Sequence, residues 1–91
     1  MVKRYEVEFL PEAVDDIERI GKGTARRILE KIGWLAENFE GIVSERLLGE
    51  FKKAFKLRVG NWRVIYAVNR KRRVLRICMI GHRSKIYRRK G

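Results

Sequence analysis

The sequence has one cysteine, one proline, one histidine and no glutamine in 91 residues, and no carboxylate follows Glu50. The single cysteine, Cys78, has no partner in the chain, which excludes an internal disulfide and a cysteine-rich zinc site and favours a reducing compartment. No apolar run approaches the roughly 18 residues of a membrane span, and the N-terminus lacks the apolar stretch of a signal peptide. We therefore expect a cytoplasmic protein without a membrane anchor.

The length and the motif inventory limit the possible functions further. A chain of this size forms one domain, residues 1–91, with a single modest core. It contains neither a P-loop nor a glycine-rich dinucleotide loop, and its one histidine leaves most metal sites without ligands. We therefore expect no cofactor and no metal.

Positive charge is concentrated in the second half of the chain. Residues 1–50 contain 8 Lys and Arg against 11 Asp and Glu, whereas residues 51–91 contain 15 Lys and Arg and no acid. A half without carboxylates cannot neutralise its own charge, so a polyanionic partner is predicted. Nucleic acid is the leading candidate and an acidic protein segment the next; a membrane surface is disfavoured because no basic amphipathic helix is present. A basic surface without a partner is the remaining alternative.

The first half of the sequence predicts a strand and two helices. Residues 3–9 alternate charged and apolar side chains, as a strand does. Pro11 opens a helix with an acidic first turn, and Gly21 ends it. Thr24 is a candidate N-cap for a second helix, whose apolar residues recur at helical spacing until residues 38–41. We expect these helices to form an antiparallel hairpin that covers one face of a sheet.

The second half predicts an antiparallel meander. Its strands are Phe51–Val59, Trp62–Asn69 and Val74–Gly81, divided by Gly60-Asn61 and by a turn near Arg70-Lys71. The predicted fold is therefore α+β. It comprises an N-terminal strand, a helical hairpin and a three-stranded antiparallel meander, with the helices packed on one face of a sheet of four to five strands.

A two-residue Gly60-Asn61 loop fixes the register of the first hairpin. It sets Arg58 opposite Arg63 and Lys56 opposite Ile65, so the three basic side chains share one face. Like charges directly opposed destabilise a sheet, and a bound phosphate backbone would favour the pair because guanidinium groups match phosphate oxygens. The alternative is that both side chains extend apart into water.

The same reasoning extends to the second hairpin. A two- or four-residue turn sets Ile65 against Arg76 and Arg63 against Cys78, which adds Arg76 to the basic face. The residues predicted for the core side are Phe55, Leu57, Val59, Trp62, Val64, Tyr66, Leu75, Ile77 and Met79.

The last segment, residues 81–91, is basic but interrupted by Ile86 and Tyr87. We expect part of it to dock beside the sheet and to bring Arg83 and Tyr87 towards the basic face. His82 is either a general acid or base or a turn residue hydrogen-bonded to backbone, and both alternatives stay open. Tyr87 either shuttles a proton or stacks on a base, or it packs the tail.

This inventory permits cleavage of RNA, because the 2′-hydroxyl of the substrate supplies the nucleophile. The protein has to orient that hydroxyl, take up its proton and stabilise charge on the phosphorane. Arginine and lysine side chains are sufficient for these tasks.

The helical hairpin, the stretch LLGEFKKAFKLRVGNWRVIYAV and the closing GHRSKIY together resemble the RelE/ParE toxin superfamily of toxin–antitoxin systems, in particular its RelE-type branch. The resemblance spans nearly the whole chain. It implies an mRNA interferase that enters the A site of a 70S-type ribosome and cuts mRNA by 2′-hydroxyl attack, leaving a 2′,3′-cyclic phosphate, without a metal. It also implies a cognate acidic antitoxin, RelB-like, that masks the basic face.

The resemblance implies a role for individual residues. Lys56 resembles the lysine that orients or deprotonates the nucleophile, and Arg63 the arginine that binds the phosphate. Arg83 resembles the arginine that stabilises the transition state or protonates the leaving oxygen, and Tyr87 the tyrosine that stacks on or activates the substrate. The predicted catalytic residues are therefore Lys56, Arg63, Arg83 and Tyr87, and the predicted RNA-binding residues are Arg58, Arg76, His82, Lys85 and Arg88.

Arg58 departs from the family pattern, which often has a second lysine at this position. Because guanidinium is a poor proton acceptor, the base would be Lys56, His82 or Tyr87. Two other functions compete with the interferase. One is a ParE-like toxin that inhibits DNA gyrase by protein contact, and the other is an RNA- or ribosome-binding module without catalysis.

Overall fold

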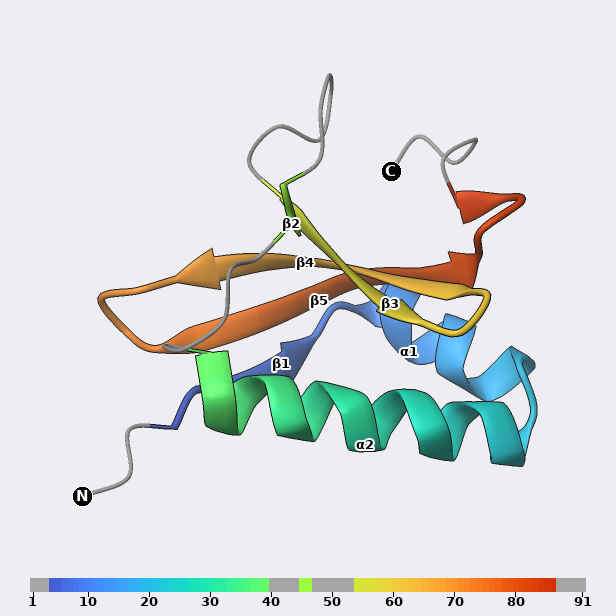
Figure 1. Ribbon diagram of the computed structural model, residues 1–91, viewed down its shortest axis with the longest axis horizontal. Helices are drawn as coiled ribbons and strands as arrows, with labels where there is room; N and C mark the ends of the chain where they lie inside the picture. The colour runs from blue at the N-terminus through green and yellow to red at the C-terminus, as the bar shows by residue number, and fades with distance from the viewer. Residues whose placement is uncertain (1–3, 40–44, 47–53, 87–91) are drawn as a thin grey trace.

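The computed structural model describes residues 4–39, 45–46 and 54–86 (Figure 1). Along the chain the elements are β1 (Glu6–Phe9), α1 (Pro11–Arg19), α2 (Lys22–Asn38), β2 (Glu45–Arg46), β3 (Phe55–Val59), β4 (Trp62–Asn69) and β5 (Val74–His82). The predicted α+β fold is confirmed, as are the strand that precedes the helices and the meander that follows them.

The strands form one mixed sheet in the order β1-β5-β4-β3-β2. β1 runs parallel to β5, and the other neighbours are antiparallel. Both helices lie on the same side of the sheet (Figure 1). The other side is called the helix-free face below. No helix in the described ranges is long and apolar enough to cross a membrane.

The two helices begin for different local reasons. Pro11 occupies the first position of α1, where its missing N–H would have no helical partner. α2 begins at Lys22, and Gly21 stands at its N-cap with a φ of 91°, a conformation that favours glycine. The prediction that Thr24 caps this helix is therefore wrong. A glycine can make the tight connection between the helices, so the helix begins before Thr24.

The main core lies between the helices and the sheet. Apolar side chains of α1 and α2 pack against alternate residues of the strands, as a half-buried sheet requires. Its buried members are Tyr5, Ala13, Ile28, Ile32, Leu35, Ala36, Phe39, Val64, Tyr66, Leu75, Ile77 and Ile80.

The register of the first hairpin is confirmed. Arg58 pairs with Arg63 and Lys56 with Ile65. Gly60 occupies the first central position of the turn with a φ of 60°, which a two-residue hairpin loop of type II′ requires at this point.

The register predicted for the second hairpin is wrong. Ile65 faces Met79 rather than Arg76, three residues further along β5. Two features cause the shift. The four-residue turn occupies residues 70–73, so its centre lies one residue later than predicted, and β5 contains a bulge.

The bulge also changes which side chains enter the core. The register passes from Met79 opposite Ile65 to Ile77 opposite Tyr66, so Cys78 is the extra residue. As a result Arg63 faces Gly81 rather than Cys78. Met79, predicted for the core, lies instead on the helix-free face, because an extra residue reverses the alternation of side chains beyond it.

Met79 belongs to a second apolar cluster with Ile65 and Ile86, and Ala54 and Cys78 pack at its edge. Ile86 is 1% exposed. The segment after β5 therefore turns back over the helix-free face, which confirms the prediction that part of the tail docks on the sheet.

α1 protects the part of β5 that β1 leaves uncovered. β1 pairs only with Val74 to Ile77. Beyond this point the N–H of Leu10 donates to the carbonyl of Ile77 (2.9 Å), and the N–H of Ile80 donates to the buried carboxylate of Asp16 (2.8 Å). A helix thus replaces a strand in satisfying this edge.

Candidate functional site

The candidate site lies at the end of the sheet that carries the β3–β4 turn. Because Leu57 and Val64 face the core, their neighbours Arg58 and Arg63 point to the helix-free face. The predicted opposition of these two arginines is therefore present. The face they share is the one that the helices leave accessible.

The side chain of Arg63 is held against the turn. Its Nη1 donates to the carbonyls of Gly60 and Trp62, both at 2.9 Å. One guanidinium nitrogen makes both bonds. Because these bonds hold the guanidinium in place, Nη2 and Nε remain as donors in a fixed orientation. Such a fixed guanidinium suits the paired oxygens of a phosphate.

Arg83 reaches the same turn from β5. β5 extends to His82, which pairs with Trp62, and the backbone N–H of Arg83 then donates to the carbonyl of Asn61 at 2.8 Å. The Arg83 side chain is exposed. The structure therefore brings the backbone of Arg83 to the hairpin that carries Arg58 and Arg63.

Lys56 lies half-buried beside the second apolar cluster, opposite Ile65. Ile86 packs on Ile65 in that cluster. The docked tail thus passes close to Lys56. Tyr87 and Arg88, predicted as catalytic and RNA-binding, lie outside the described residues.

His82 occupies a turn position. Its Nδ1 lies 2.9 Å from the hydroxyl of Ser84 and accepts from the Ser84 N–H at 3.2 Å. Its ring meets that of Trp62 edge to face, with centroids 5.6 Å apart. Because Trp62 belongs to the core side, the register places His82 on the opposite side of the sheet from Arg63. The structure thus agrees with the turn alternative for Nδ1.

Lys85 is exposed in the turn after β5, where its N–H donates to the carbonyl of His82 at 2.9 Å. Arg76 shares the helix-free face, as predicted, but not the site. It pairs with Ala67 and lies 3.5 Å from the carboxylate of Glu8 on β1. The shifted register of the second hairpin moves it towards the other end of the sheet.

The sequence reasoning missed a second basic group. Arg70, Lys71 and Arg72 lie in the β4–β5 turn, which the strand pattern identifies only as a boundary between strands. The signal was visible in the run of four basic residues at 70–73. In the described ranges, no group of three or more His, Cys, Asp or Glu could hold a metal ion.

Comparison with models of known protein families identifies the family of this chain. Residues 7–87 match the family model described as the ParE toxin of type II toxin–antitoxin systems, parDE. The chain belongs to the RelE/ParE toxin superfamily. A comparison with curated proteins gives no significant match.

Solved structures of RelE toxins share the fold of this RelE/ParE protein. The RelBE2 toxin–antitoxin complex of Mycobacterium tuberculosis aligns with a TM-score of 0.80 at 22% identity, over 92% of this chain and 97% of that chain. The isolated RelE toxin of Escherichia coli gives 0.72 at 20% identity, over 92% of each chain. The RelE–RelB complex of Pyrococcus horikoshii gives 0.66 at 26% identity, over 93% of this chain and 99% of that chain.

Proposed function

We propose that this toxin is an mRNA interferase, a ribosome-dependent and metal-independent endoribonuclease that cuts mRNA in the A site by 2′-hydroxyl attack. The observation that carries the proposal is that three arginine residues lie at the β3–β4 turn. Arg58 and Arg63 oppose each other across the hairpin, and the backbone of Arg83 is hydrogen-bonded to Asn61.

The roles follow from the chemistry of each side chain. Arg63, fixed by the turn carbonyls, binds the scissile phosphate and neutralises charge on the phosphorane. Arg83 stabilises the same charge from the end of β5 or protonates the leaving oxygen. Lys56 orients the 2′-hydroxyl or takes its proton, and Tyr87 stacks on the substrate or assists the proton transfer. Arg58 binds the flanking backbone.

An antitoxin partner is part of this proposal. Four of the related structures are complexes of a RelE-type toxin with its RelB-type antitoxin or an antitoxin peptide. The whole chain carries 12 more positive than negative charges. An acidic antitoxin segment that folds on binding would neutralise its basic face.

Cleavage of mRNA on programmed ribosomes tests the activity. The intact protein should produce 2′,3′-cyclic phosphate ends within the A-site codon. Arg83→Ala and Lys56→Ala should each reduce the single-turnover rate by over about a hundredfold, because each removes a group that acts in the transition state. Arg26→Ala, an exposed arginine on the far side of α2, is the matched control and should cleave normally. Binding to ribosomes without any cleavage would refute the proposal.

A second candidate is inhibition of DNA gyrase by protein contact, as in ParE-like toxins. It is favoured by the family model, whose description is that of ParE. A supercoiling assay with purified gyrase separates the two, because a gyrase inhibitor would not need Lys56 or Arg83. Loss of supercoiling at equimolar toxin, unchanged in Lys56→Ala, would favour this candidate.

A further inference from the structure

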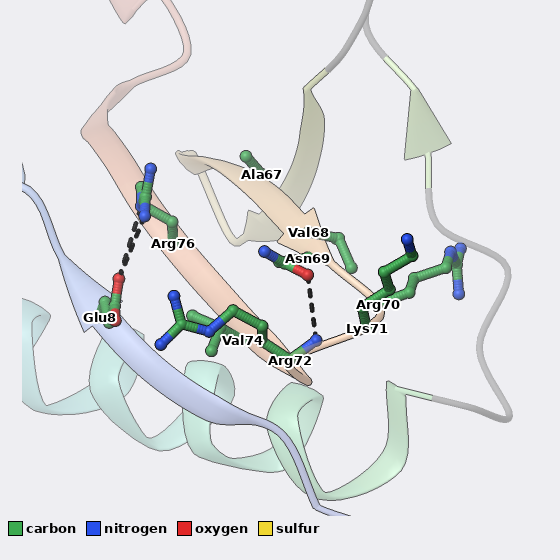
Figure 2. Close-up of a pocket in the computed structure, with 9 residues that line it drawn as sticks. All are labelled: Glu8, Ala67, Val68, Asn69, Arg70, Lys71, Arg72, Val74 and Arg76. Atoms are coloured by element: carbon green, nitrogen blue, oxygen red, sulfur yellow. Dashed lines mark hydrogen bonds and ion pairs between the residues drawn. The ribbon is translucent and has the colours of Figure 1, made fainter.

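A second basic surface lies at the end of the sheet away from the candidate site. It is a hollow of about 380 Å³ beside the β4–β5 turn, called the turn pocket below (Figure 2). Its lining residues are Glu8, Ala67, Val68, Asn69, Arg70, Lys71, Arg72, Val74 and Arg76. Figure 2 shows Arg72 and Arg76 on one side of this pocket and Arg70 and Lys71 on the other.

The turn that carries Arg70, Lys71 and Arg72 is braced by two hydrogen bonds. The side-chain oxygen of Asn69 accepts from the backbone N–H of Arg72 at 3.0 Å. Arg73 has a φ of 57°, and its carbonyl accepts from the N–H of Glu6 at 2.8 Å. The basic side chains therefore project from a fixed backbone, which limits the ordering cost of binding a ligand.

The pocket has four basic side chains and one carboxylate. Glu8 lies 3.5 Å from Arg76, and the guanidinium of Arg70 lies over the ring of Phe39, 5.2 Å from its centroid. Lys71 and Arg72 are exposed, and their side chains form no ion pair with another described residue. Within the described part of the chain, no ion pair has to break for these two cations to bind an anion.

We propose that the turn pocket binds the phosphate backbone of the same RNA strand that occupies the candidate site. This inference rests on the proposed function and extends it. The pocket and the site share one face of β4. Arg63, Ala67 and Asn69 are separated by even numbers of residues along this strand, so their side chains point to the same face.

The spacing fits a single strand of RNA. Arg63 and Asn69 are six residues apart on β4, so their separation along the strand is about 20 Å. At roughly 3.4 Å per stacked nucleotide, this corresponds to about six nucleotides. The ligand is the backbone rather than the bases, because the lining offers cationic donors and no aromatic side chain on which a base could stack.

Oligouridylates of two lengths test the inference. A strand of about 4 nucleotides can cover only the candidate site, whereas one of about 12 can also reach the turn pocket. The test variant is Lys71→Ala/Arg72→Ala. The control is Lys22→Ala/Arg26→Ala, which removes the same charge from exposed positions on α2.

The test variant should bind the longer strand about tenfold more weakly and the shorter strand nearly normally. Its plot of log affinity against log salt should become shallower by about 1.4 for the longer strand, as expected when two phosphate contacts are lost. The control variant should show the same small loss for both lengths. Equal losses for both lengths in the test variant, or no greater loss than in the control, would overturn the inference.

An oligoglutamate of about 12 residues distinguishes an acidic peptide from RNA. Tighter binding of this peptide than of the longer RNA, with the same dependence on Lys71 and Arg72, would also overturn the inference. Neither outcome depends on cleavage. A protein that binds with the expected length dependence but does not cut mRNA would refute the proposed function and leave the turn pocket assigned to RNA.

Discussion

The carboxylate of Asp16 on α1 lies 2.8 Å from the backbone nitrogen of Ile80 on β5. Asp16 is 7% exposed, and Ile80 belongs to the core. A side chain of the first helix therefore completes the hydrogen bonding of the last strand, just before that strand reaches the candidate site.

We expect Asp16→Ala to lower the free energy of unfolding by about 2 to 3 kcal/mol, because it leaves a buried N–H unpaired. Asp16→Asn, whose amide oxygen can still accept, should lose about 1 kcal/mol. Asp15→Ala, exposed on the same helix, should change it by less than about 0.5 kcal/mol. Urea unfolding measures all three, and equal effects at positions 15 and 16 would contradict the role of this hydrogen bond.

Ile86 fastens the tail to the helix-free face through Ile65 and Met79. We expect Ile86→Ala to cost about 2 to 3 kcal/mol of stability and Ile86→Val about 1 kcal/mol. Under the proposed function, the alanine variant should also lower cleavage of mRNA, because the turn that holds Arg83 and Lys85 loses its anchor. Hydrogen exchange at the Lys85 amide, which is bonded to the carbonyl of His82, should accelerate. Unchanged exchange would show that the tail has another anchor.

We expect the planar guanidinium group of Arg63 to contribute to cleavage through its geometry as well as through its charge. Arg63→Lys keeps the cation but loses the geometry that joins the turn carbonyls to a phosphate. Under the proposed function, the cleavage rate of bound mRNA should fall by about tenfold or more while affinity for RNA changes by less than about threefold. Single-turnover kinetics separate the two quantities. An equal loss in both would assign Arg63 to binding alone.

Cys78 should react slowly with thiol reagents. Burial raises the pKa of its thiol, and Arg76 opposes part of the rise. Rates of alkylation by iodoacetamide against pH should therefore have a midpoint at higher pH than in urea-unfolded protein. Because the fold favours the neutral thiol, its contribution to stability is complete below the unfolded pKa and declines as pH rises through the folded one. Arg76→Met should move the midpoint further up, and a downward movement would contradict this assignment.

Arg73 adopts a left-handed backbone conformation at the end of the β4–β5 turn. Glycine takes up this conformation without steric strain, although it also gains freedom in the unfolded chain. We expect Arg73→Gly to raise the free energy of unfolding by about 0.5 kcal/mol. Thermal unfolding measures the change, and Arg72→Gly, at a position without a positive φ, should be destabilising.

The spacing of apolar residues is sufficient to predict the helices and strands, and with the Gly60-Asn61 loop it predicts the register of the first hairpin. Helices and strands differ in their apolar spacing, and a two-residue loop leaves a single register, so Arg58 and Arg63 could be paired in advance. The second hairpin could not be predicted this way. A run of basic residues does not define where its turn begins and ends.

The bulge at Cys78 could not be predicted from the sequence either. It interrupts an apolar stretch in which each residue is compatible with either face of the sheet. For this reason the sequence predicts Met79 in the core. The displacement of Arg76 has a different cause, the position of the turn, because Arg76 pairs with Ala67 before the bulge is reached. The helix start was missed because a positive φ at Gly21 made an N-cap at Thr24 unnecessary.

The parallel pairing of β1 with β5 joins segments that lie 68 residues apart, as in the contact between Glu8 and Arg76. During synthesis the first strand and both helices emerge long before the strand that they pack against. Contacts so distant along the chain form late and slow the folding of a domain. Arg76 and the backbone of Arg83 therefore take their places only after residues 74–82 have left the ribosome that made them, so a nascent chain does not present the complete basic surface.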